Sequence, residues 1–157
     1  MQFAGLTFKV SPDRVLAPAA GEAASVEINR PVAALYFLHA AELTDREALT
    51  EALKASEAWE GIHIGAYEIE YASGERVTLA LRYPMELRDP QPGWCKVPVA
   101  YRALGVYPAT CEAEGRHLYA MQWINPRPEE PVAKVTLTTL EAPARPMLAG
   151  LCVQPAR

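Results

Sequence analysis

The stretch IGAYEIEYASGERVTLALRY, residues 64–83, decides the fold class. Apolar and polar residues alternate on both sides of the loop at 72–74, which is the pattern of a β-hairpin with one buried face. A three-residue loop with its glycine in the left-handed conformation places Ile69 opposite Val77. The same register sets Glu70 beside Arg76 on the solvent side, so apolar faces and charges predict one pairing.

Shorter strand patterns recur along the rest of the chain. They cover residues 23–28, 32–39, 118–124, 132–140 and 147–153. The run at 32–39 is almost wholly apolar, as in a central strand that is buried on both faces. With turn or proline-rich segments such as 125–131 between them, these strands predict an all-β fold. The expected architecture is an antiparallel β-sandwich rather than a set of βαβ units.

One segment departs from the strand pattern. Thr44 to Glu47 has the T-x-x-E form of a capping box, and Leu49 and Leu53 follow at helical spacing. We expect one short helix near 45–58, inserted between two strands, which covers an edge or an end of the sandwich. Trp59, directly after this helix, is expected to anchor it to the sheets.

Length and charge restrict the class of protein. The chain has 157 residues, so we expect a single domain, 1–157, around one core. Its 15 basic and 19 acidic residues give a net charge of −4, which argues against nucleic acid as a partner. The 14 prolines against 9 glycines favour strands and rigid loops over long helices. Since no apolar run approaches 18 residues, we expect no membrane partner.

The cysteines indicate neither a metal knuckle nor a redox motif, because no C-x-x-C pair is present. Cys152 lies in an apolar run and is expected to be a small buried hydrophobe. Cys95 and Cys111 are either two free thiols, the favoured reading, or one disulfide. The beginning of the sequence does not resemble a signal peptide, and the location stays open because the parent protein could be secreted or periplasmic.

Signals for catalysis are weak, so we expect no enzymatic activity in this chain and no catalytic residues. No pair of carboxylates is singled out, and no G-x-S-x-G sequence is present. The three histidines lack the short spacing that metal sites often use, so no metal or other cofactor is expected. A structural calcium ion remains compatible with sandwich loops, although no D-x-D-x-D run supports it.

Four segments, in order, carry a family resemblance: residues 29–41, 65–74, 81–83 and 123–128. Together they look like a galactose-binding-like jelly-roll module of the kind that accompanies bacterial glycoside hydrolases, over about residues 5–153. The resemblance implies a β-sandwich with a non-catalytic role, either binding an oligosaccharide or polysaccharide or packing against a catalytic domain. The loop at 84–89 departs from the family pattern, since it lacks glycine and asparagine and retains only Asp89. That departure puts a polar or calcium site in this loop in doubt.

A saccharide site needs an aromatic platform for the sugar ring and a few fixed polar groups for its hydroxyls. The candidates near predicted strand ends and loops are Trp94, Tyr101, Arg82, Asp89, His39, Asn125 and Arg127. Trp94 is the preferred platform, because it follows a glycine in a proline-rich loop and a strand core explains it least.

Several of these residues have a structural alternative. His39 closes an apolar strand and is more often a hydrogen-bonded structural histidine than a ligand. Asn125 opens a turn by capping its own backbone. Arg82 is also expected to pair with a glutamate across the sheet. Core packing is expected for at least one of Tyr119, Met121 and Trp123, which alternate along one predicted strand. The alternative function is accordingly a structural or protein-interaction domain without a glycan site.

Overall fold

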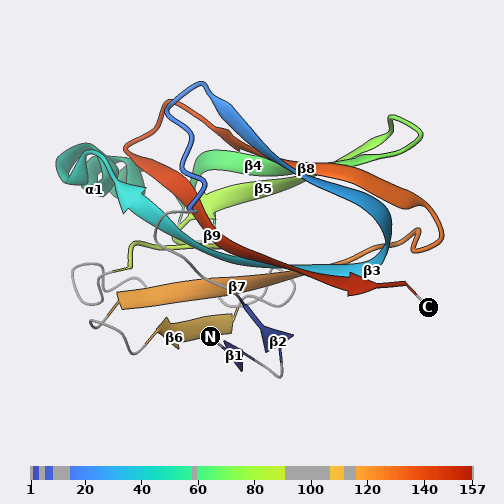
Figure 1. Ribbon diagram of the computed structural model, residues 1–157. Coiled ribbons are helices and arrows are strands. Elements are labelled where there is room, and N and C mark those ends of the chain that lie inside the picture. The colour runs from blue at the N-terminus through green and yellow to red at the C-terminus, as the bar shows by residue number, and fades with distance from the viewer. Residues whose placement is uncertain are drawn as a thin grey trace.

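The computed structural model describes residues 2–3, 6–8, 15–57, 60–90, 107–111 and 116–156. These residues form an all-β fold with one helix, as the sequence predicts, and the strand pairs are antiparallel (Figure 1). In chain order the elements are β1 (Gln2–Phe3), β2 (Leu6–Thr7), β3 (Ala23–Leu43), α1 (Arg46–Ala55), β4 (Ile62–Tyr71), β5 (Arg76–Tyr83), β6 (Tyr107–Cys111), β7 (Arg116–Ile124), β8 (Pro131–Thr139) and β9 (Ala144–Pro155).

Strand β3 organises the sheet. Its first half pairs with β8, and its second half lies between β7 and β9. The segments 23–28 and 32–39, predicted as two strands, are therefore parts of one strand. The turn-like residues between them produce an irregularity in register between Glu27 and Arg30, with Asn29 at a φ of 50°. The apolar part of β3 is the buried central strand that the sequence predicts.

Because β3 changes partners, the sheet curls into two arms (Figure 1). The first arm has the order β5-β4-β8-β3, and the second arm is formed by β3 with β9, β7 and β6. Side chains of both arms meet in one core. Phe37 of the second arm stacks on Tyr67 of the first, with ring centroids 4.2 Å apart, and Trp123 lies 6.5 Å from Tyr71.

The β4–β5 hairpin confirms the predicted register. Ile69 is opposite Val77, and Glu70 is opposite Arg76 with 2.9 Å between their charged groups. Gly74 has a φ of 89°, the left-handed conformation that the three-residue loop requires.

Helix α1 lies at one end of the curled sheet (Figure 1) and buries Leu49 in the core. Its N-cap is Asp45, whose carboxylate accepts a hydrogen bond from the Ala48 N–H at 2.9 Å. The capping-box pattern placed the cap one residue too early, at Thr44. The helix also ends at Ala55, three residues before the predicted end. Trp59 lies outside the described residues.

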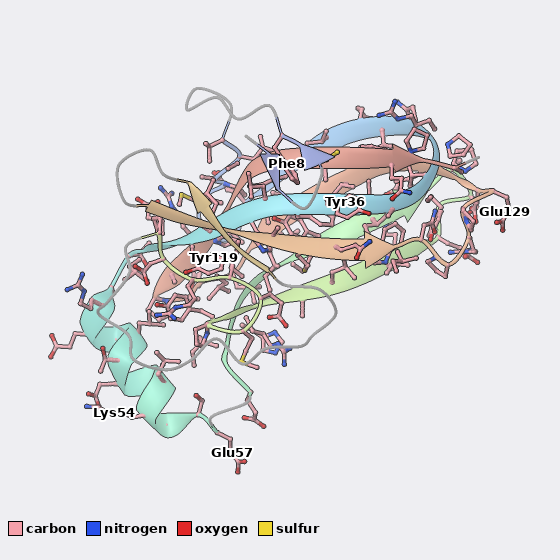
Figure 2. The ribbon with its side chains drawn as sticks, turned by 90° about the horizontal axis from the view of Figure 1, so that it is seen from below. Phe8, Tyr36, Lys54, Glu57, Tyr119 and Glu129 are labelled. Atoms are coloured by element: carbon pink, nitrogen blue, oxygen red, sulfur yellow. The ribbon has the colours of Figure 1, made fainter. Side chains whose placement is uncertain are left out.

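The outer face of the second arm is partly covered by the N-terminal segment. Phe8 is buried against Leu38 and Ala120, and Tyr36 packs beside this cluster (Figure 2). Cys152 also contacts this cluster and is half-buried, so it packs as a small hydrophobe but is not enclosed by the core.

Candidate functional site

The five predicted site residues that the structure describes do not converge on one point. Trp94 and Tyr101 lie outside the described residues, as does Cys95 of the disulfide alternative. The other five divide between two ends of the sheet. His39, Arg82 and Asp89 lie around the loop after β5, whereas Asn125 and Arg127 lie in the loop after β7.

His39 is fully buried, and both ring nitrogens are occupied by protein groups. Its Nε2 lies 3.1 Å from the carbonyl oxygen of Glu86, which can only accept, so this nitrogen carries the proton. Its Nδ1 therefore accepts from the Tyr67 hydroxyl at 3.1 Å. Burial lowers the pKa of His39 to about 4, although the hydrogen bond to Glu86 opposes that shift. This neutral imidazole fastens the 84–90 loop to β3 and β4.

The loop at 84–89 is packed into the protein. Met85 and Leu87 are buried, and the Asp89 carboxylate accepts a hydrogen bond from the Tyr83 hydroxyl at 3.0 Å. The N–H of Ala41 donates to the Arg88 carbonyl at 2.7 Å, which ties the loop to β3. The apolar residues of this loop thus give it a role in packing.

Asn125 is buried, and its side chain makes four hydrogen bonds. Its oxygen accepts from the Tyr71 hydroxyl at 2.6 Å and from the Arg127 N–H at 2.9 Å. Its amide donates to the carbonyls of Val32 at 2.9 Å and Arg127 at 3.0 Å. The predicted turn cap is confirmed by the bond to the Arg127 N–H.

Arg127 joins the two loops at this end of the sheet. Its guanidinium lies 4.1 Å from the centre of the Tyr71 ring and forms ion pairs with Glu75 and with Glu130, the latter at 3.1 Å. Burial raises the pKa of Tyr71, so its hydroxyl keeps the proton that it donates to Asn125. These contacts connect the turn of the β4–β5 hairpin with the β7–β8 loop.

A groove of about 290 Å³ between β5 and β7 brings Arg82 and Trp123 together. We call it the edge groove; it is lined by Thr78, Leu79, Ala80, Arg82, Glu86, Met121, Gln122 and Trp123. Trp123 is 8% exposed, so it belongs to the core, as the structural alternative predicts, and presents only a margin of its surface to the groove. The ion-pair partner of Arg82 is Glu86 in the following loop, and the expected pairing across the sheet is wrong.

The edge groove follows two open strand edges. In the described part of the chain, β5 pairs only with β4, and residues 121–124 of β7 pair only with β3. The Arg82 N–H donates to the Glu86 carboxylate at 2.8 Å and therefore faces away from β4. Since backbone groups alternate along an antiparallel strand, those of Thr78 and Ala80 also face the groove. No local sequence pattern predicts this groove, because its two walls lie about 40 residues apart in the chain.

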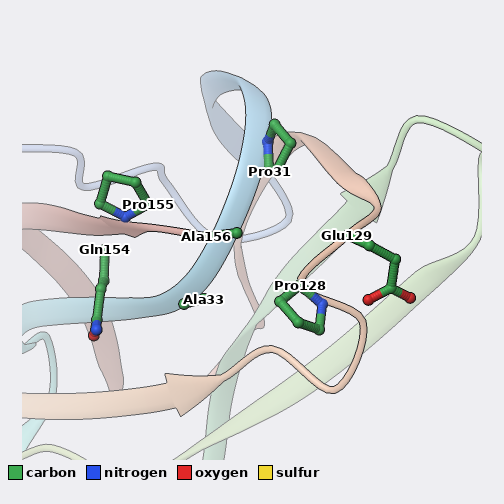
Figure 3. A pocket seen from close by; sticks show the side chains of 7 residues that line it. All are labelled: Pro31, Ala33, Pro128, Glu129, Gln154, Pro155 and Ala156. Atoms are coloured by element: carbon green, nitrogen blue, oxygen red, sulfur yellow. The ribbon is translucent and has the colours of Figure 1, made fainter.

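A second recess, of about 690 Å³, lies where the end of β9 approaches β3 and the β7–β8 loop (Figure 3). It is lined by Pro31, Ala33, Pro128, Glu129, Gln154, Pro155 and Ala156. It offers one carboxylate and one amide, and the Gln154 amide oxygen already accepts from the Tyr36 hydroxyl at 2.9 Å. Because none of its described lining residues is aromatic, these residues do not form the platform that a sugar ring needs.

Within the described ranges, histidine, cysteine, aspartate and glutamate side chains form no group of three that could hold a metal ion. No helix in this part of the structure has the length and apolar character needed to cross a membrane. No protein-family model, curated protein or solved structure matches this chain.

Proposed function

We propose that this chain is a non-catalytic accessory module that binds a saccharide in the edge groove. The observation that supports the proposal is that Trp123 and Arg82 line the same groove. Leu79, Met121 and the indole margin supply apolar surface for the face of a sugar ring, while Arg82 and Thr78 supply polar groups for its hydroxyls. The volume of about 290 Å³ is at the lower end of small-ligand pockets, which suits a short segment of a glycan.

A galactose-binding-like jelly-roll sandwich is the fold that we propose for this module. Its support is the division of an antiparallel sheet into two arms that share β3 and a single core. In a glycoside-hydrolase context, the catalytic residues would belong to a partner domain, and this chain would hold the substrate near them.

Thermal unfolding against a panel of oligosaccharides tests the proposal, because a ligand that binds only the folded chain raises the unfolding midpoint. We expect one class of saccharide to raise the midpoint with increasing concentration. The variant Ala80→Trp fills the edge groove from an exposed position and is expected to abolish that rise.

Ala23→Trp is the matched control, since Ala23 is also an exposed alanine on a strand but does not line the groove. It should leave the ligand-induced rise unchanged. If no saccharide raises the midpoint, or if Ala80→Trp binds as well as the parent chain, the edge groove is not a saccharide site.

The open edge of β5 favours a second candidate function, a protein-interaction domain that pairs by strand addition. The backbone groups of Thr78 and Ala80 that face away from β4 could bond to a strand of another chain. Light scattering that showed a dimer, lost in Thr78→Pro, would favour this candidate. Proline removes the outward N–H while leaving the pairing with β4 in place.

A further inference from the structure

The guanidinium of Arg82 has two hydrogen-bonding edges, and only one of them is used. Its Nε donates to both carboxylate oxygens of Glu86 at 3.2 Å, and its Nη2 donates to Glu86 Oε1. Among the described residues, Nη1 makes no hydrogen bond. The side-on edge, formed by Nε and Nη2, is thus occupied by Glu86. The end-on edge, formed by Nη1 and Nη2, remains available in the groove.

Glu86 cannot serve as an acceptor for a ligand. Its side chain is 5% exposed, and its two oxygens already accept the Arg82 backbone N–H and the guanidinium donors. At this point the groove therefore offers donors without a carboxylate acceptor. A sugar hydroxyl can accept a hydrogen bond from these donors, but its own O–H finds no carboxylate acceptor there. A carboxylate accepts through two coplanar oxygens and matches the free guanidinium edge.

We infer that the saccharide bound in the edge groove is acidic, a uronate whose carboxylate pairs with the end-on edge of Arg82. This inference rests on the proposed function and names the substrate class of the same site. The pairing of Arg82 with Glu86 orients the guanidinium before the ligand arrives, so little side-chain freedom is lost on binding. The described lining residues include one cationic side chain and no lysine, which suits one planar carboxylate better than a sulfate ester that spreads charge over three oxygens.

Matched pairs of acidic and neutral ligands test the inference on the unaltered chain. The probes are oligosaccharides of galacturonate, mannuronate and glucuronate, each compared with its methyl ester, which keeps the ring and hydroxyls and removes the charge. Calorimetry is expected to give at least about ten-fold tighter binding of one acid than of its ester, consistent with a charge-assisted hydrogen-bonded pair.

Arg82→Lys identifies the group that recognises the carboxylate. Lysine keeps the charge but loses the planar fork, so we expect binding of the acid to weaken more than binding of the ester, and the preference for acid over ester to fall about ten-fold. Circular dichroism checks that the variant folds. The comparison of acid with ester in the parent chain does not depend on this variant.

The outcomes separate this inference from the proposed function. Equal affinities for acid and ester, or binding only to a neutral sugar of the wider panel, would overturn the acidic ligand and leave the saccharide site standing. Tighter binding of a sulfated oligosaccharide than of any uronate would also overturn it. Failure of every saccharide to bind would remove both proposals.

Discussion

Acidification should destabilise this protein through His39. The pKa of His39 is about 4 in the folded chain and 6.5 when the side chain is exposed. As the pH falls through 6.5, His39 binds a proton in the unfolded chain but not in the folded chain, so the equilibrium shifts toward unfolding. The contribution of neutral His39 to stability is complete above this range and is lost between pH 6.5 and about 4.

The size of the effect follows from the difference in pKa. Each pKa unit corresponds to about 1.4 kcal/mol, so a shift from 6.5 to about 4 lowers the free energy of unfolding by about 3 kcal/mol at full protonation. That is a large share of the stability of an ordinary domain, which is about 5–15 kcal/mol. Protonation also turns Nδ1 into a donor, which opposes the proton donated by the Tyr67 hydroxyl.

Urea unfolding at a series of pH values, combined with NMR titration of the imidazole, measures both parts of the prediction. His39→Gln should lose the steep part of the pH dependence, whereas His63→Gln, at an exposed position, should retain it. The reasoning fails if the His39 ring titrates near 6.5 in the folded protein. It also fails if the parent chain and His39→Gln lose the same stability between neutral pH and the acid range.

Four further substitutions test the packing and the caps. Gly65→Ala should lower the free energy of unfolding by about 3 kcal/mol or more, because the added Cβ would lie 2.2 Å from a β8 carbonyl oxygen. Denaturant titration measures this loss, and a loss below about 1 kcal/mol would contradict the close approach. Asn125→Ala should cost about 2–4 kcal/mol in the same assay, since the Tyr71 hydroxyl and a buried carbonyl lose their partner, and a neutral effect would show that water replaces the amide. Asp45→Ala should cost about 1 kcal/mol and Thr44→Ala less, an order that would be reversed if the capping box governed the helix start.

The hairpin and the helix could be predicted because their signals are local. The alternation around Gly74 and the charges of Glu70 and Arg76 act within a few residues of the loop, and the structure keeps that register. The helix start was displaced by one residue, since neighbouring Thr44 and Asp45 can both cap and the sequence alone does not rank them.

The strand division and the candidate site depended on tertiary structure. The residues between 28 and 32 have the composition of a turn, yet pairing on both halves of β3 keeps them within one strand, with an irregularity at Asn29. The edge groove joins strands that are distant in sequence, and the partner of Arg82 depends on how the 84–90 loop folds back on β5. A local pattern contains neither piece of information.

The shared strand β3 also has a consequence for synthesis of the protein. Its apolar second half leaves the ribosome early, whereas the partners of this half, β7 and β9, follow much later, and β9 ends at Pro155, more than 100 residues after Leu43. At a synthesis rate of about 5–20 residues per second, this half of β3 remains without its partner strands for on the order of ten seconds. During that interval the nascent chain presents a long unpaired apolar strand, which is the kind of segment that chaperones shield and that aggregates when they do not.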